Sequence, residues 1–357
     1  MKILIVAPSL RLGGLENAAS TMANWLSHVG HEVFFVLCYK SGSFYELSSN
    51  VEILAPDFSH SKNRKGVFYI RWLFFVRNEI TRLSPDVILS YGDYHSSLVS
   101  FANLFNDSPL VISDRASPGL SFPVYMRLIR NIAYPFCSGV IAQTERAAFV
   151  KRKLARNGVR ISVIPNPVRS FEPSLKVDRE KVVLAAARHY HVKGLDRLVH
   201  AFSKVNAPDW QLHIAGSPGP ETKNLEEQVV NLGLAGRVKF LGGVQDMAAI
   251  YSSAGIYVLP SRSEGFPNAL IEAMSLGCPS VAFDINAGPS EIISNGVDGI
   301  LVPDGDIDAM SGVIQRLVDN PLIRSSLSSE AIKIKDNLSL DSIGRKYESF
   351  LKTVAGK

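Results

Sequence analysis

Short apolar runs alternate with amphipathic helical patterns along the whole chain. Seven runs occupy the first half, at residues 2–8, 31–39, 51–54, 85–90, 109–113, 138–143 and 161–166, and six occupy the second, at 181–187, 210–216, 237–242, 255–261, 279–283 and 299–302. Nearly continuous apolar strands separated by helices are typical of parallel sheets covered on both faces. The pattern therefore predicts an α/β protein with two doubly wound halves.

The boundary between the halves is expected in the segment VIPNPVRSFEPSLKVDRE, because its three prolines suit neither a helix nor a strand. We place the linker at residues 166–181 and predict domains over 1–166 and 167–340. The remaining residues, 341–357, are expected to form a terminal helix, because Ile343, Tyr347, Phe350 and Leu351 have helical spacing.

Composition narrows the class of protein. The 357 residues are 46% hydrophobic and 20% charged, which is typical of two globular domains. Cys38, Cys137 and Cys278 lie too far apart in sequence to indicate a disulfide framework or a zinc site, so a reducing cytoplasm is expected. The first residues lack the features of a signal peptide, and no apolar run is long enough for a transmembrane helix. The net charge of +5 favours an anionic partner.

The stretch EGFPNALIEA, residues 264–273, carries two glutamates eight positions apart. Pro267 suits the first position of a helix, whose free amides and dipole can bind a phosphate. Glu264 would precede this helix, and Asn268 and Glu272 would share one of its faces. The two acids could then contact different parts of one ligand. The alternative is that Glu264 is a solvated loop acid and Glu272 is a surface helix residue. The spacing of the two glutamates, taken alone, favours this alternative.

A second candidate is the turn ARHYHVKG after the apolar run 181–187. Parallel strands bind ligands at their carboxyl ends, and two cations there, Arg188 and Lys193, suit a diphosphate. Two opposite unit charges about 4 Å apart attract each other by roughly 4 kcal/mol at an effective dielectric near 20. Stabilising a departing diphosphate by this amount would raise the reaction rate about a thousandfold. The alternative is that both are ordinary exposed cations. His189 and His191 lack a third metal ligand and are expected to be loop residues.

Further candidates follow other strands. Gly13 and Gly14 lack the G-x-G-x-x-G spacing of dinucleotide binders, so they either let the backbone approach a ligand or only form a tight turn. The acidic segment DGDID resembles a metal-binding motif, but Asp306 fits better as a helix N-cap. Strand ends also carry the acceptor-side candidates Asp93, His95, Asp114 and Arg115.

Several of these motifs occur together in one order. The Gly-Gly turn, VIPNPV, the R-x-x-x-x-K-G turn, IAG, VKFLG and SRSEGFPNALIEAMSLGCPSVA together resemble the retaining glycosyltransferases of family 4. The resemblance implies the GT-B fold, in which two Rossmann-like domains face a central cleft, the N-terminal one binding the acceptor and the C-terminal one the nucleotide sugar. It also implies that the terminal helix packs back on the N-terminal domain.

The resemblance assigns roles to individual residues. Arg188 and Lys193 would hold the donor diphosphate, Glu264 would lie under the donor sugar, and Glu272 would bind the ribose. The remaining donor-binding positions would be Gly13, Gly14, Gly216, Gly265, Phe266, Pro267, Asn268 and Ala269. Asp114 stands where many members have histidine, and SDR is similar to a subset that builds exopolysaccharide and lipid-linked oligosaccharide.

The implied reaction moves a sugar from a nucleotide diphosphate, expected to be UDP, to a hydroxyl of a lipid-linked glycan with retained anomeric configuration. Neither a metal cofactor nor a nucleic-acid partner is expected. A sugar-nucleotide epimerase, a phosphorylase and a non-catalytic sugar-nucleotide-binding protein remain as alternatives.

Two basic aromatic segments, residues 63–82 and 121–136, contain long aliphatic side chains and arginines. They either touch an anionic membrane surface or pack on the first sheet with their arginines reaching water. Packing on the first sheet is the favoured alternative for each segment. If the first holds, the protein lies on the inner face of the cytoplasmic membrane.

Overall fold

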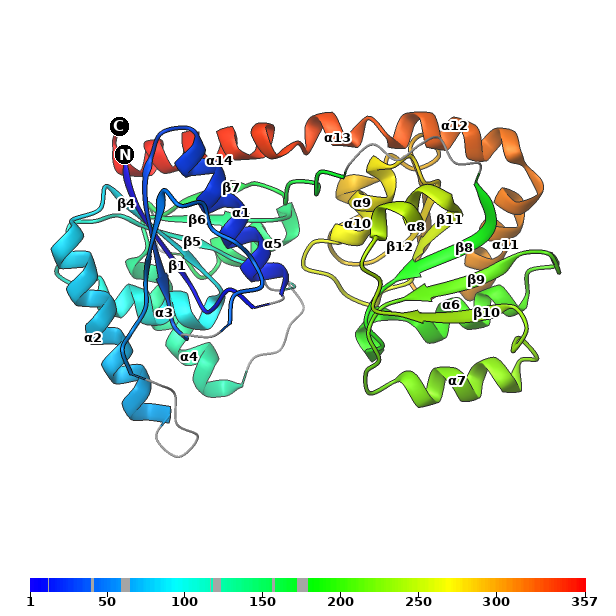
Figure 1. The fold of residues 1–357 in the computed structure, drawn as a ribbon, viewed down its shortest axis with the longest axis horizontal. Helices are drawn as coiled ribbons and strands as arrows, with labels where there is room; N and C mark the ends of the chain where they lie inside the picture. The colour runs from blue at the N-terminus through cyan, green and yellow to red at the C-terminus, as the bar shows by residue number, and fades with distance from the viewer. Residues whose placement is uncertain are drawn as a thin grey trace. The chain divides into compact units, whose positions relative to one another are not determined.

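The computed structural model describes residues 1–11, 13–39, 42–58, 65–115, 117, 123–155, 158–171 and 179–357 (Figure 1). The chain divides into two compact units. Unit 1 contains Met1–Asn166 together with Leu340–Lys357, and unit 2 contains Pro167–Ser339. Part of the expected linker, residues 172–178, lies outside the described residues.

Unit 1 is built on a parallel sheet of seven strands in the order β3-β2-β1-β4-β5-β6-β7. Its strands are β1 (Lys2–Ala7), β2 (Glu32–Leu37), β3 (Val51–Leu54), β4 (Val87–Tyr91), β5 (Leu110–Ser113), β6 (Gly139–Ala142) and β7 (Arg160–Val163). Its helices are α1 (Gly14–His28), α2 (Lys65–Leu83), α3 (Asp93–Ala102), α4 (Val124–Ala133), η2 (Tyr134–Phe136), α5 (Glu145–Arg152) and α14 (Leu340–Ala355).

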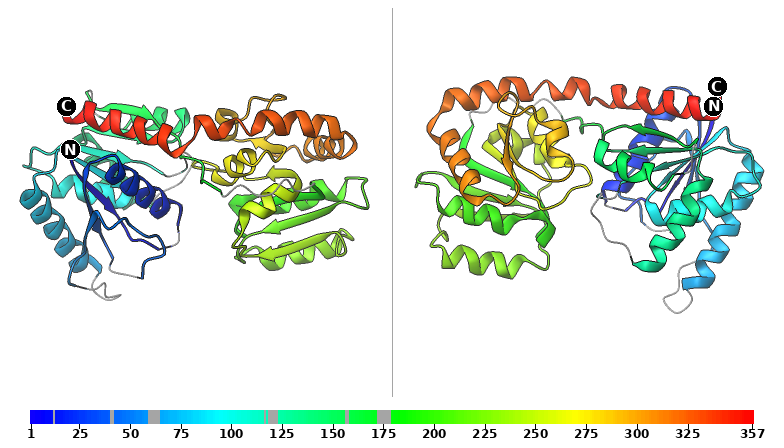
Figure 2. Two further views of the ribbon diagram at one scale, coloured as in Figure 1. Left: turned by 45° about the horizontal axis from the view of Figure 1, so that its top comes forward. Right: turned by 180° about the vertical axis from the view of Figure 1, so that it is seen from behind.

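Helix α14 ends the chain and packs in unit 1 against α1 and β4 (Figure 2). Ile343, Tyr347 and Leu351 are fully buried along its inner face. Gly344 makes the approach to α1 possible, because a Cβ at this position would lie 2.3 Å from the Trp25 ring. The helical spacing in the sequence therefore reflects a real buried stripe.

Unit 2 has a parallel sheet of six strands in the order β10-β9-β8-β11-β12-β13. They are β8 (Glu180–Ala186), β9 (Gln211–Ala215), β10 (Val238–Gly242), β11 (Ala254–Leu259), β12 (Ser280–Asp284) and β13 (Ile300–Pro303). Its helical elements are η3 (His191–Lys193), α6 (Leu195–Ser203), α7 (Thr222–Asn231), α8 (Met247–Ser253), α9 (Asn268–Ser275), α10 (Pro289–Ile292), α11 (Ile307–Asp319), α12 (Pro321–Ala331) and α13 (Ile334–Asn337).

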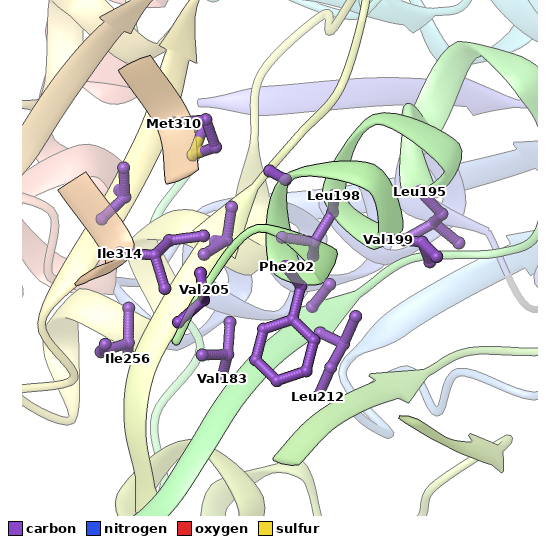
Figure 3. Packing of buried hydrophobic residues seen from close by; sticks show 14 of the residues in the cluster. Val183, Leu195, Leu198, Val199, Phe202, Val205, Leu212, Ile256, Met310 and Ile314 are labelled. Atoms are coloured by element: carbon purple, nitrogen blue, oxygen red, sulfur yellow. The ribbon is translucent and has the colours of Figure 1, made fainter. Parts of the chain in front are cut away.

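The larger core of unit 2 lies between its sheet and helices α6 and α11. Figure 3 shows Leu198 and Phe202 of α6 pointing toward Val183 and Leu212 of the strands, with Ile314 of α11 beside them. Burying such side chains contributes roughly 1.5–3 kcal/mol each. A second cluster packs α8 and α9 on the sheet, so helices cover both faces.

The predicted fold class is confirmed, since every apolar run listed above contains a strand of one of the two parallel sheets. Asp306 caps α11 as predicted and accepts a hydrogen bond from the Ala309 amide at 2.9 Å. The helix start at Pro267 is wrong by one residue, because Pro267 is the N-cap and α9 begins at Asn268. Within the described ranges, no helix has the length and apolar character needed to cross a membrane.

Candidate functional site

Three loops meet at the carboxyl edge of the neighbouring strands β9, β8 and β11, and two glycines set how closely they approach. Gly194 has φ 64°, and a Cβ there would lie 2.0 Å from the Pro260 carbonyl oxygen. Gly216 has φ 150°, and its Cβ would lie 2.0 Å from the Ala187 carbonyl oxygen. Larger residues would force the loops apart, so both glycines help to bring the candidate site residues together.

Lys193 and Glu264 form an ion pair across these loops. The Lys193 Nζ lies 2.8 Å from Glu264 Oε1 and 2.9 Å from Oε2. Ser261 donates a further hydrogen bond to Oε1 at 2.6 Å. The Lys193 side chain is 27% exposed and that of Glu264 is 9% exposed. The sequence singled out both charged residues but gave no indication of their pairing or of Ser261.

Arg188 follows β8 and is exposed to solvent. Its guanidinium lies over the Tyr190 ring, 5.2 Å from the ring centroid. No carboxylate within the described part of the chain forms an ion pair with it. The cation is therefore accessible to an anionic ligand, unlike a guanidinium held by an internal acid.

His189, the next residue, joins two of the loops. Its Nδ1 lies 2.9 Å from Thr222 Oγ1, and its backbone carbonyl accepts a hydrogen bond from the Glu221 amide at 3.1 Å. Burial lowers the pKa of His189, so the ring is neutral near pH 7. The expectation of a loop residue fits these contacts.

The start of α9 presents its first-turn amides without a side-chain cap. Phe266, 8% exposed, packs with Val168 and Ile271 and anchors the turn. Pro267 lies against Gly288, where a Cβ would be 2.8 Å from the proline Cδ. Gly265, Asn268 and Ala269 are half-buried around the same turn. The Asn268 amide donates to the Phe266 carbonyl and the Leu270 amide to the Pro267 carbonyl, each at 3.0 Å. It is therefore the positive end of the helix dipole, rather than a row of free amides, that favours an anionic oxygen at this turn.

Glu272 lies one turn further along α9 and is half-buried. Tyr251 donates a hydrogen bond to its Oε2 at 3.2 Å. Burial raises the pKa of Glu272, although the Tyr251 hydrogen bond and the positive charge of Arg169 partly oppose this shift. The carboxylate is therefore not a freely solvated surface acid, and no cation among the described residues forms an ion pair with it.

In unit 1, the Gly-Gly turn leads from β1 into α1. Gly13 is the N-cap with an extended backbone, and its carbonyl accepts a hydrogen bond from the Tyr45 hydroxyl at 3.2 Å. The Glu16 side chain folds back over Gly13 and accepts a hydrogen bond from Ser9 at 3.2 Å. No atom of the described residues lies within 4 Å of a Cβ built at Gly14, so their packing in unit 1 does not require glycine there.

Asp93 and Asp114 come together around a lysine that the sequence did not single out. The Lys151 Nζ lies 3.2 Å from Asp93 and 2.9 Å from Asp114, and all three side chains are at most 7% exposed. The Tyr134 hydroxyl donates to Asp93, and Arg130 lies 3.6 Å from it. Burial alone would raise the pKa of Asp93, but these three partners together hold it below its ordinary value.

His95 and Arg115 have other surroundings. The rings of Tyr39, Tyr69, Trp72 and Tyr94 surround His95 at centroid distances of 5.6–6.4 Å. Burial lowers the pKa of His95 to about 4, so it is neutral near pH 7. Arg115 donates to Asn166 and, at 2.7 Å, to the Tyr347 hydroxyl of α14. These contacts connect the end of β5 to the C-terminal helix.

Two family models match adjoining parts of the chain. The model described as Glycosyltransferase Family 4 matches residues 12–170, and the model described as Glycosyl transferases group 1 matches residues 169–334. The chain belongs to the family 4 glycosyltransferases. The predicted resemblance, the fold and the enzyme class are thereby confirmed.

Relatives of this glycosyltransferase include bacterial enzymes. It is 26% identical over 370 residues to an α-1,4-N-acetyl-D-galactosaminyltransferase of Campylobacter jejuni, covering 99% of this chain and 98% of that one. It is 32% identical over 219 residues to an exopolysaccharide phosphotransferase of Streptomyces coelicolor, but the match covers only 23% of that protein. The Anabaena HepE structure with UDP superposes with a TM-score of 0.80 at 20% identity, covering 99% of this chain and all of that one.

The arrangement in this glycosyltransferase combines two cations, an uncapped helix start and two carboxylates at one edge of the sheet in unit 2. Cations and amides stabilise developing negative charge on a departing group when they are held in place before the reaction. Because Gly194 and Gly216 fix the loops, the positions of these groups are set largely by the protein rather than by the ligand.

Proposed function

We propose that this glycosyltransferase transfers a sugar from a UDP-sugar to a hydroxyl of a lipid-linked glycan, with retained anomeric configuration, in bacterial surface polysaccharide assembly. Binding of the donor is supported by one observation, the cluster of loop residues in unit 2 that contains Lys193, Glu264, Ser261 and the exposed Arg188. The acceptor class is supported by the printed substrate of the Campylobacter relative, a diNAcBac-PP-undecaprenol oligosaccharide. Uridine is supported by the UDP in the Anabaena structure.

Lys193 and Arg188 are the proposed ligands of the donor diphosphate, together with the positive end of the α9 dipole. A diphosphate carries more negative charge than the single carboxylate of Glu264, so it can compete for the partly exposed Lys193 ammonium. Glu264 then remains close to the donor sugar. Glu272, whose carboxylate accepts a hydrogen bond from Tyr251, is the proposed contact of the ribose hydroxyls.

The proposed sugar transfer needs no protein side chain to act as the base. The acceptor oxygen forms a bond to the anomeric carbon, the bond from that carbon to the diphosphate oxygen breaks, and the acceptor proton moves to the departing phosphate oxygen on the same face. Charge that develops on the diphosphate is stabilised by Lys193, Arg188 and the N-terminal end of the α9 dipole. No metal is assigned a role in this proposal.

A membrane-facing surface is part of the proposal. Helix α2 buries Phe68 and Trp72 in the core, so packing accounts for one of its faces. Its opposite face and α4 leave large apolar side chains 52–62% exposed: Val67, Ile70, Phe74, Val124, Tyr125, Leu128, Ile132 and, just after α4, Phe136. The exposed cations Arg71 and Arg127 accompany them. Such a surface suits the interface of an anionic bilayer that carries the acceptor.

Transfer is tested with UDP-glucose, UDP-galactose and their N-acetylated forms, using an undecaprenyl-diphosphate oligosaccharide as acceptor. We expect UDP release that depends on the acceptor, and an axial product linkage from an α-linked donor by the anomeric NMR coupling. Inversion would refute the retaining mechanism. Interconversion of UDP-sugars without an acceptor would favour an epimerase, transfer to inorganic phosphate a phosphorylase, and tight UDP-sugar binding without turnover a binding protein.

The membrane surface is tested by flotation with vesicles containing anionic phospholipid. Leu128→Glu with Ile132→Glu is expected to abolish co-flotation at low salt without changing the melting temperature. Leu322→Glu is the matched control, because Leu322 is 85% exposed in unit 2. Failure of the wild type to float would refute peripheral binding and leave the transfer reaction to its own assay.

A further inference from the structure

Arg262 follows β11 and contacts the loop that carries Lys193. Its guanidinium forms a bidentate ion pair with the Asp196 carboxylate, with N–O distances of 2.7 and 2.6 Å. The same guanidinium donates to the His191 carbonyl at 2.8 Å, and the Arg262 backbone amide donates to the Val192 carbonyl at 2.8 Å. Hydrogen bonds from one residue therefore reach the chain on both sides of Lys193 in sequence.

The Arg262–Asp196 pair sets geometry more than it adds stability. The two side chains are 22% and 42% exposed, and ion pairs that reach solvent in this way contribute little to the free energy of unfolding. Burial would raise the pKa of Asp196, but the hydrogen bonds and charge of Arg262 hold it below its ordinary value, so the carboxylate is ionised near pH 7. A planar guanidinium that meets both carboxylate oxygens fixes distance and angle together, which a lysine ammonium does not.

We infer that Arg262 and Asp196 are positioning residues that keep the Lys193 backbone in place when its ammonium moves from Glu264 to a bound diphosphate. The inference rests on the proposed function. In the ligand-free chain, the ion pair of Lys193 with Glu264 itself joins the two loops. Binding of a diphosphate would withdraw that contact, whereas the Arg262 contacts do not use the Lys193 side chain and would remain. The loop is then ordered on folding rather than on binding, which raises the affinity for the diphosphate.

Unit 2 contains a matched control pair. Arg197 lies 2.7 Å from Asp304, and these side chains are 21% and 46% exposed, close to the values for Arg262 and Asp196. The Arg197 side chain joins α6 to the segment after β13 instead of to the loop of Lys193. Loss of either pair therefore removes a similar ionic contact, but loss of Arg262 also removes the hydrogen bond to the His191 carbonyl.

The first test compares Arg262→Met with Arg197→Met by melting temperature and by calorimetric titration with UDP. We expect both variants to lower the melting temperature by similar amounts, a few degrees at most. Arg262→Met should raise the Kd for UDP roughly tenfold, the effect of having to order one flexible side chain and its loop on binding. Arg197→Met should change the Kd less than about twofold. Equal Kd values for the two variants would overturn the inference.

Arg262→Lys keeps the positive charge and tests whether geometry matters. We expect the Kd for UDP to rise several-fold, because an ammonium does not reproduce the fork that meets Asp196 and the His191 carbonyl together. Wild-type affinity in this variant would show that charge alone is needed and would refute a positioning role.

The second test repeats Arg262→Met in a Lys193→Ala background. If Arg262 acts by positioning Lys193, its loss should then change the Kd for UDP less than about twofold. A tenfold rise in both backgrounds would show that Arg262 contacts the ligand itself or supports unit 2 as a whole, and it would overturn the inference.

The outcomes also separate this inference from the proposed function. A wild type that binds UDP but transfers no sugar would refute the proposed function, and the Kd comparisons would still decide the role of Arg262. A wild type that binds none of UDP, GDP and ADP would refute both.

Discussion

Each unit contains a lysine held by carboxylates, and the two sites differ in how completely the lysine is enclosed. Among the described residues, Lys193 of unit 2 pairs with one carboxylate, that of Glu264, and 27% of its side chain is exposed. In the same described part of the chain, Lys151 of unit 1 pairs with two, those of Asp93 and Asp114, and 5% of its side chain is exposed.

This difference in exposure indicates which of the two lysines an anionic ligand can bind. An anion that approaches Lys193 from solvent replaces a single carboxylate, whereas removal of Lys151 would take from two buried aspartates the cation that they share. Asp93 and Asp114 were predicted as acceptor-side residues, and that role stays a prediction. Their contacts with Lys151 link α3, the end of β5 and α5 inside unit 1.

Replacement of the enclosed lysine should have the largest effect. Lys151→Met removes the cation shared by two buried carboxylates, although Asp93 keeps Arg130 at 3.6 Å, so we expect the free energy of unfolding of unit 1 to fall by roughly 3 kcal/mol at pH 7. Urea denaturation measures this change. Lys153→Met is the control, because Lys153 is exposed two residues further along the chain. A loss below about 1 kcal/mol would mean that Lys151 is not the partner on which these acids depend.

The pH dependence of the stability loss caused by Lys151→Met tests whether Asp93 is paired with Lys151. The pKa of Asp93 is below its ordinary value in the folded protein, so its contribution to stability is present above the unfolded pKa and is lost as the pH falls through the folded one. The difference between wild type and Lys151→Met should therefore narrow as the pH falls below about 4. A difference that stays constant down to pH 3 would contradict the assigned pairing.

Replacement of the open lysine should act on catalysis instead. Lys193→Ala is expected to lower kcat/KM about a thousandfold, equivalent to about 4 kcal/mol, because one cation no longer stabilises the departing diphosphate. Initial-rate assays with the UDP-sugar measure it. The control is Lys181→Ala, since Lys181 lies on β8 of the same unit and is 64% exposed. Equal activity of both variants would remove Lys193 from the reaction.

Substitution of the two glutamates should change different kinetic constants, kcat for Glu264 and the KM of the donor for Glu272. Glu264→Gln is expected to lower kcat more than tenfold with a smaller change in the KM of the donor, because the residue is proposed to lie under the reacting sugar. Glu272→Gln should raise the KM of the donor several-fold and leave kcat nearly unchanged, since it is proposed to bind the ribose. The opposite pattern would exchange their roles.

The smallest expected effect is on the ligand-free protein. Burial raises the pKa of Glu272 above its unfolded value, so this residue reduces stability as the pH rises from the unfolded pKa through the folded one. Glu272→Gln should therefore become slightly more stable relative to wild type between pH 4 and 7, by about 1 kcal/mol or less. Thermal unfolding across this range measures the effect. A gain that appears only on acidification would reverse the sign and contradict the burial argument.

Local patterns singled out much of the proposed donor site because several of its features are local. Strand ends, turn glycines and the start of α9 are visible as short motifs, and the charged residues next to them became candidates. The helix start was wrong by one residue because a proline suits both the N-cap and the first helical position, and the sequence does not distinguish the two. Gly216 and Gly194 are required by contacts with another loop, which the sequence does not show.

The cluster around Lys151 could not be predicted from the sequence. Lys151 lies in ERAAFVKR, where basic residues in the last turn of a helix are usually exposed. Its partners Asp93 and Asp114 lie 58 and 37 positions earlier in the chain. Tyr134 is in a short 3-10 helix whose apolar neighbours suggest packing only. No sequence pattern connects these residues.

The sequence by itself determined the two parallel sheets, the family and the identities of the charged residues after the strands, because hydrophobic periodicity and turn chemistry act over a few residues. Only the tertiary structure decided which charges pair. Lys193 and Glu264 are 71 positions apart, and their contact depends on how strands β8 and β11 lie side by side. Burial, which raises the pKa of Glu272, likewise depends on every element packed around a side chain.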